Sequence, residues 1–121
     1  MGDIYLITYP GAISQIVSNL VFNSVTHAFE QGEKGKIVLK FSIENNQLLF
    51  TFNDNGKGIS PDHLKKVFTP FFTTKRGEGG TGLGLSIVYS LVTATLKGKI
   101  EVKSSKMEGT KFNIQFPLVQ D

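Results

Sequence analysis

The chain has 121 residues, of which 40% are hydrophobic, 19% are charged and ten are phenylalanine. This length fits one domain with its own hydrophobic core, and the composition excludes a disordered chain. Because the chain has no cysteine, it forms no disulfide bond and no thiolate zinc site. The net charge of +3 does not require a nucleic-acid partner, and no window approaches the roughly 20 apolar residues of a membrane span. We therefore expect neither nucleic-acid binding nor membrane contact.

The first half of the chain predicts a strand, a helix and a hairpin. A short strand is expected at residues 4–8, and a helix follows up to Glu30, because its apolar residues are spaced by three and four. Residues 36–43 alternate between apolar and polar, and residues 48–52 form the next strand. The two asparagines at 45–46 suit the turn between them.

The second half predicts two helices and a closing hairpin. A short helix starts at Ser60 with a serine cap and a proline in its first turn, and Pro70 ends it. Residues 83–97 form the last helix, which Gly98 closes in the left-handed conformation. The closing strands are expected at 100–103 and 112–116. This order predicts a two-layer α/β sandwich, with a mixed sheet and about three helices packed on one face.

The first helix carries a polar stripe, Gln15, Asn19, Asn23 and His27, with a spacing of four. Side chains four apart are neighbours on a helix surface. An ordinary polar helix edge is one interpretation of this stripe. The other is that amide oxygens, with water and phosphate, bind a hard cation such as Mg²⁺.

Two glycine-bearing segments could contact a nucleotide. Residues 54–59 (DNGKGI) follow a strand directly, and form either a plain turn or a base pocket in which Asp54 accepts from an exocyclic amine. Residues 77–85 (GEGGTGLGL) open a helix, and form either a hinge or a phosphate cradle. The same segment contains G-x-G-x-x-G, with Glu101 about 20 residues on, but it lacks the buried strand that a dinucleotide fingerprint needs before it.

Five segments in this order resemble the boxes of sensor histidine kinases. The N box matches residues 19–23 (NLVFN), the first glycine box residues 54–59, the F box residues 67–75 (VFTPFFTTK), the second glycine box residues 80–86 (GTGLGLS), and a final glycine-threonine pair residues 109–110. The chain thus resembles the catalytic ATP-binding domain of a histidine kinase, in the ATPase fold shared with type II topoisomerases and MutL-like repair proteins.

The resemblance implies a role for each matching residue. Asn19 and Asn23 would be the catalytic pair, with Asn23 as the Mg²⁺ ligand and Asn19 supporting it. Asp54 would read the adenine amine, with Thr110 nearby, and residues 75–82 would form a lid over the phosphates whose near end Phe68, Phe71 and Phe72 anchor. The expected nucleotide-binding residues are Asn23, His27, Asp54, Gly56, Gly58, Ile59, Phe72, Lys75, Arg76, Gly80, Thr81, Gly82, Leu83, Gly84 and Thr110.

Asn19 separates the subclasses of this family. Hydrolytic relatives and related serine kinases carry a glutamate there, four residues before the metal-binding asparagine, as a general base. An amide cannot act as a base, whereas an imidazole acceptor already has a nucleophilic lone pair and has less need of a base. The sequence therefore favours transfer of a phosphoryl group to histidine. A glycine common two residues before the final pair is Met107 here, so we expect that turn to differ.

We therefore expect residues 1–121 to be the catalytic ATP-binding domain of a longer kinase, a fragment that lacks the dimerisation and phosphoacceptor domain. With ATP and Mg²⁺ as cofactors it would phosphorylate a histidine of that domain, and the phosphoryl group would pass to a response regulator. Little autophosphorylation is expected from the domain alone, and a cytoplasmic location is expected. The alternatives are a nucleotide-binding regulatory module without catalysis and an anti-sigma-type serine kinase.

Overall fold

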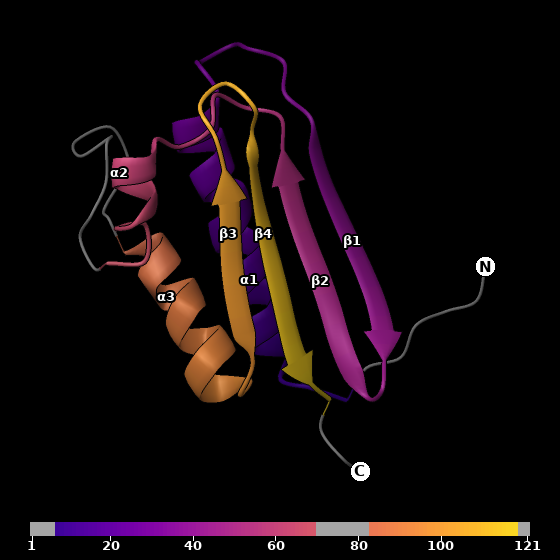
Figure 1. The fold of residues 1–121 in the computed structure, drawn as a ribbon. Coiled ribbons are helices and arrows are strands. Elements are labelled where there is room, and N and C mark those ends of the chain that lie inside the picture. Colours follow the sequence, from indigo (N-terminus) through magenta and orange to yellow (C-terminus); the bar gives the residue numbers. More distant parts are fainter. Residues whose placement is uncertain (1–6, 70–82, 119–121) are drawn as a thin grey trace.

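The structure is a computed structural model that describes residues 7–69 and 83–118 (Figure 1). Its helical elements are α1 (Pro10–Asn23), η1 (Ser24–Ala28), α2 (Pro61–Leu64), α3 (Gly84–Ser90) and η2 (Leu91–Thr95). Its strands are β1 (Ile37–Glu44), β2 (Gln47–Asp54), β3 (Lys99–Ser104) and β4 (Thr110–Pro117). Most of the strand expected at residues 4–8, and the lid expected at 75–82, lie outside the described residues.

The four described strands form one sheet in the order β1-β2-β4-β3. All three pairings are antiparallel, whereas we expected a mixed sheet. The register of the central pair sets Asp54, the last residue of β2, opposite Thr110, the first residue of β4. Two polar residues that are distant in the sequence thus meet at one end of the sheet.

The helices cover one face of this sheet, so the predicted two-layer α/β sandwich is confirmed (Figure 1). Every second residue of β2 and β4 points toward the helices and is buried. The core is completed by the apolar faces of α1 and of α3 with η2. Its strand residues are Leu48, Phe50, Phe52, Phe112, Ile114 and Phe116, and its helix residues include Ile16, Leu20, Val88 and Val92.

Each long helix ends in a π-helical turn. The predicted first helix is α1 followed by η1 and ends at Ala28, and the predicted last helix is α3 followed by η2. In η1 the backbone N–H of Ser24 still donates to the carbonyls of Leu20 and Val21. A π turn accommodates an extra residue and is frequent at functional sites.

Two predictions about turns have different outcomes. Asn45 and Asn46 have φ of 50° and 60°, so the predicted tight turn is confirmed, with both central residues in the left-handed region. The prediction for Gly98 was wrong, because Lys97, with φ of 59°, adopts the left-handed conformation. Gly98 is required for space instead, since a Cβ there would collide with the Gln115 carbonyl and with Phe116 in β4.

The turn between β3 and β4 keeps a left-handed backbone at Met107, with φ of 70°. A methionine in this region is strained, because its Cβ approaches the neighbouring backbone. The glycine that the family resemblance leads us to expect at this position would adopt the same conformation without strain. The turn therefore differs from the family pattern in its residue and retains a glycine-like backbone.

Candidate functional site

A cavity of about 780 Å³ opens between the helical layer and the end of the sheet where Asp54 and Thr110 meet. Its wall comes from α1 and η1, the loop after β2, α2, the start of α3 and the β3–β4 turn. The structure brings nine of the predicted site residues together in this wall. They are Asn19, Asn23, His27, Asp54, Gly58, Ile59, Leu83, Gly84 and Thr110.

Asp54 is a buried carboxylate in the wall of the cavity. It is 3% exposed, and each of its oxygens accepts one hydrogen bond. The Ser24 hydroxyl donates to Oδ2 over 2.5 Å, and the Gly56 backbone N–H donates to Oδ1 over 3.0 Å. A carboxylate has about four acceptor positions, so two remain. Asp54 can therefore accept from a ligand in the cavity.

Thr110 is held beside Asp54 by a hydrogen-bond network around Ser104. The Ser104 hydroxyl accepts from the Ile59 N–H over 2.8 Å and donates to the Gly109 carbonyl over 2.8 Å. Because its one proton is used there, the 2.9 Å contact between Ser104 and Thr110 has Thr110 as its donor. The Thr110 hydroxyl oxygen can therefore still accept a hydrogen bond from a ligand next to Asp54.

Asn19 and Asn23 also line the cavity and differ in their partners. The Asn19 oxygen accepts from Gln15 Nε2 over 2.7 Å, and its nitrogen donates to the Gly84 carbonyl over 3.2 Å. Asn19 thereby ties α1 to the first residue of α3. The Asn23 amide has no hydrogen-bond partner in the described part of the chain. Asn23 is thus the amide whose oxygen is available to a ligand.

The residues around Asn23 could hold a hard cation only if oxygens of a bound ligand complete its coordination. Within residues 7–69 and 83–118, no group of three or more His, Cys, Asp or Glu side chains could hold a metal. One amide oxygen on Asn23, completed by water and phosphate oxygens, is a coordination that Mg²⁺ accepts. The residues present therefore fit Mg²⁺ bound together with a phosphate-bearing molecule.

The start of α3 lines the cavity. A Cβ built on Gly84 would have no heavy atom of the described residues within 4 Å, and Leu83 makes no side-chain capping hydrogen bond. The N–H groups at a helix start interact favourably with negative charge. Together with Asn23, this part of the cavity wall can accommodate an anionic group.

Gly56 is not among the residues that line the cavity, and a Cβ there would collide with Ala28. Its missing side chain lets the loop approach η1, where the Lys57 N–H donates to the Ala28 carbonyl over 3.0 Å. Gly58 does line the cavity; it has φ of 75°, and a Cβ there would collide with the Ser105 carbonyl. Both glycines therefore serve close packing of the protein itself.

Several cavity residues were not predicted. Lys57 lies inside the first glycine box, and Lys106 and Met107 lie in the β3–β4 turn. The others are Phe22, Ala28, Ser60, His63, Val67, Leu85 and Ile87. Lys57, Phe22, Val67 and Leu85 lie inside the family boxes, and that position was the signal in the sequence. The apolar residues could not be distinguished from core residues by their spacing.

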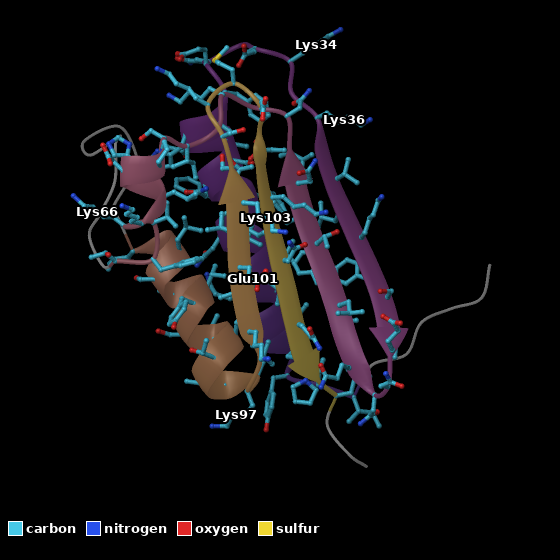
Figure 2. All side chains as sticks on the ribbon, in the orientation of Figure 1. Lys34, Lys36, Lys66, Lys97, Glu101 and Lys103 are labelled. Carbon is cyan, nitrogen blue, oxygen red and sulfur yellow. The ribbon has the colours of Figure 1, made fainter. Side chains whose placement is uncertain are left out.

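Some predicted residues lie elsewhere. Phe68 is half-buried at the edge of the core, with its ring centroid 6.4 Å from that of Phe112 and 5.3 Å from that of Tyr89. The lid that it was expected to anchor lies outside the described residues. Figure 2 shows Glu101 on the sheet face opposite α1, away from the cavity, as expected if no dinucleotide fingerprint is present. Phe71, Phe72, Lys75, Arg76, Gly80, Thr81 and Gly82 lie outside the described residues.

No helix among residues 7–69 and 83–118 has the length and apolar character needed to cross a membrane.

Comparisons with known sequences identify the family of the chain. Residues 8–120 match the family model described as histidine kinase-, DNA gyrase B- and HSP90-like ATPase. A sensor histidine kinase, ZraS of Salmonella typhi, is 38% identical over 111 residues, which are 91% of this chain and 23% of that protein. Sporulation kinase E of Bacillus subtilis is 32% identical over 93% of this chain and 14% of that protein. The chain thus spans less than a quarter of the length of these curated relatives.

Solved structures show the same fold. The nucleotide-free catalytic domain of histidine kinase ThkA has a TM-score of 0.75 and 32% identity, over 91% of this chain and 69% of that one. Full-length ShkA in complex with AMPPNP has a TM-score of 0.74 and 29% identity, over 92% of this chain and 22% of that one. The chain therefore belongs to the family of histidine kinase-, DNA gyrase B- and HSP90-like ATPases, as a catalytic ATP-binding domain of the sensor histidine kinase type.

Proposed function

We propose that the cavity binds ATP with Mg²⁺, and that the chain transfers the γ-phosphoryl group to a histidine on a separate dimerisation domain. The observation that carries this proposal is that one cavity combines two kinds of group. It is lined by the acceptors of Asp54 and Thr110, which we assign to the base, and by Asn23 and the start of α3, which we assign to the phosphates. The volume of about 780 Å³ lies within the roughly 300–1,000 Å³ typical of ligand sites.

The acceptors of Asp54 and Thr110 would recognise adenine. Asp54 has two acceptor positions beyond those used by Ser24 and Gly56, and the exocyclic amine of adenine is a donor that matches them. Guanine carries a carbonyl at the equivalent position, so its oxygen would face a carboxylate oxygen. The half-buried Ile59 and the exposed Met107 provide apolar surface for the base.

Asn23 and the start of α3 would hold the phosphates. Asn23 would contribute its amide oxygen to Mg²⁺, and Asn19 would hold the start of α3 in place through Gly84. When bound, the cation neutralises the negative charge that develops on the phosphate oxygens. The protein's own contribution is to orient the phosphate chain between α1 and α3. Phosphoryl transfer depends mainly on such positioning and electrostatics.

The chemistry of Asn19 favours histidine as the acceptor. The Asn19 oxygen already accepts from Gln15 and its nitrogen already donates to Gly84. In addition, an amide does not accept a proton at neutral pH. A serine or water nucleophile would need such a base, whereas a neutral imidazole attacks with its own lone pair. We propose that the acceptor lies on a dimerisation domain of the full-length kinase, and that a response-regulator aspartate receives the phosphoryl group from it.

A phosphotransfer assay tests this proposal. The domain is mixed with a separately expressed dimerisation domain from the same kinase, Mg²⁺ and γ-labelled ATP. We expect acid-labile, base-stable label on the dimerisation domain, because phosphohistidine has that stability. Asn23→Ala should reduce the label at least tenfold, whereas Asn53→Ala, which removes an exposed amide on the sheet away from the cavity, should not.

Two other results would contradict the proposal. Nucleotide binding without any labelled partner would indicate a regulatory module without catalysis. Acid-stable label on a serine would indicate a serine kinase.

A further inference from the structure

Ser24 is a polar residue at a core position of the first helix. The buried face of α1 repeats every four residues, through Ala12, Ile16 and Leu20, and Ser24 and Ala28 continue this repeat into η1. Ser24 is 1% exposed. Packing alone requires only a small side chain here, as at Ala28. A buried hydroxyl costs free energy unless it finds a partner, so this hydroxyl requires a specific explanation.

The partner of Ser24 is the carboxylate that faces the cavity. Its hydroxyl donates to Asp54 Oδ2 over 2.5 Å. A hydrogen bond to an ionised acceptor is among the stronger kinds in proteins. Asp54 lines the cavity, whereas Ser24 does not. Ser24 therefore cannot touch a ligand in the cavity, and acts on it only through Asp54.

The carboxylate is fixed from two sides. Ser24 holds Oδ2 and the Gly56 N–H holds Oδ1, so rotation of the carboxylate group would break both hydrogen bonds. A further bond from the Lys57 N–H to the Ala28 carbonyl ties the same loop to the same π-helical turn. The loop after β2 and the end of the first helix thus form one unit that presents the remaining acceptor positions of Asp54 in a fixed direction.

We propose that Ser24 is a positioning residue that orients Asp54 and thereby sets the selectivity of the cavity for bases carrying an exocyclic amine. The inference rests on the proposed nucleotide binding and adds the residue that makes the base contact selective. A fixed acceptor avoids the loss of side-chain freedom that ligand binding would otherwise impose. Without Ser24, Asp54 keeps one hydrogen bond, and its carboxylate can turn away from the base.

The test compares two nucleotides in Ser24→Ala. The probes are ATP and the triphosphate of purine riboside, which lacks the amine at C6, each titrated with Mg²⁺. We expect ATP to bind about tenfold more weakly to Ser24→Ala than to the wild type, as for loss of an interaction with a charged group. We expect the amine-free nucleotide to change less than twofold, because it makes no contact with Asp54.

Two further variants serve as controls. Ser18→Ala makes the same substitution at an exposed position of α1 outside the cavity wall and should leave both affinities unchanged. Ser24→Thr keeps the hydroxyl and should keep the preference for ATP. If Ser24→Ala does not fold, Ser24→Cys replaces it, since a thiol is a much weaker donor and should show the same selective loss.

The outcomes separate this inference from the proposed function. A wild type that binds neither nucleotide would contradict the proposed function itself. A wild type that binds ATP, with Ser24→Ala binding it equally well, would overturn only the role of Ser24. An equal loss for both nucleotides would also overturn it, because that result indicates a general packing role.

Discussion

Replacing Asp54 by asparagine separates base recognition from folding, because it keeps the shape of the side chain and exchanges one acceptor oxygen for a donor. In the folded protein the asparagine oxygen can still accept from the Gly56 N–H, as Oδ1 of Asp54 does. Its NH₂ group then faces the Ser24 hydroxyl, which can rotate to accept. The change removes the negative charge from both hydrogen bonds and leaves the Ser24 hydroxyl proton unpaired. We expect a loss of about 1–2 kcal/mol in the free energy of unfolding.

The effect on nucleotide binding should be larger and selective. The exocyclic amine of adenine would lose a charged acceptor, which is worth about 1.5–3 kcal/mol, or about 10- to 150-fold in Kd. The asparagine NH₂ would in addition place a donor opposite a donor. Guanine, with a carbonyl at that position, would gain a donor. We therefore expect Asp54→Asn to bind ATP at least tenfold more weakly, and GTP as well as or better than the wild type does.

Calorimetric titration with ATP and GTP, combined with urea unfolding, measures both quantities. Asp62→Asn is the matched control, since Asp62 is exposed in the first turn of α2 and does not line the cavity. A loss of affinity that is equal for ATP and GTP would refute the assignment of Asp54 as the base-reading residue. A destabilisation that exceeds the loss in ATP binding would show that Asp54 acts mainly in folding.

Three further predictions concern the walls of the cavity. Asn23→Ala should abolish the increase in ATP affinity that Mg²⁺ produces and leave metal-free binding within about twofold, as titrations with and without EDTA will show; an unchanged Mg²⁺ effect would exclude Asn23 as a ligand. Met107→Gly should raise the free energy of unfolding by about 0.5–1 kcal/mol, because it removes the strain of a methionine in the left-handed conformation at φ of 70°. Urea unfolding measures this as a higher midpoint, and a lower midpoint would contradict this account of the turn. Gly58→Ala should destabilise the domain by about 2 kcal/mol or more, because φ is 75° and the Ser105 carbonyl occupies the space of the new methyl group; thermal unfolding would refute this if the variant melted with the wild type.

Local patterns predicted the fold well. The strand patterns predicted all four of the described strands, and Asn45-Asn46 identified the tight turn, since both signals depend on neighbours in the sequence. Gly98 was assigned to the wrong cause. Its absent side chain is required by close approach to β4 and not by its own φ, and tertiary contacts of this kind leave no local signal.

The sequence predicted some of the site residues from local spacing, and others only from the resemblance to a family. The polar stripe containing Asn19 and Asn23 follows from helical spacing, but the meeting of Asp54 with Thr110 depends on strand register, and only the family resemblance placed those two residues together. The role of Ser24 was not predicted, because its spacing marks it as one more position on the buried face of the first helix. Its function follows from a contact with a residue on another element.

The most direct test of the central claim is a nuclear magnetic resonance titration of the ¹⁵N-labelled domain with Mg²⁺ and a non-hydrolysable ATP analogue. The account predicts shifts of the backbone amide signals in both parts of the cavity wall, at Gly58 and Thr110 for the base and at Leu83 and Gly84 for the phosphates. Omitting Mg²⁺ should reduce the changes at the residues assigned to the phosphates more than those at the residues assigned to the base. The absence of any shift at millimolar nucleotide, or shifts confined to residues outside the cavity, would contradict it.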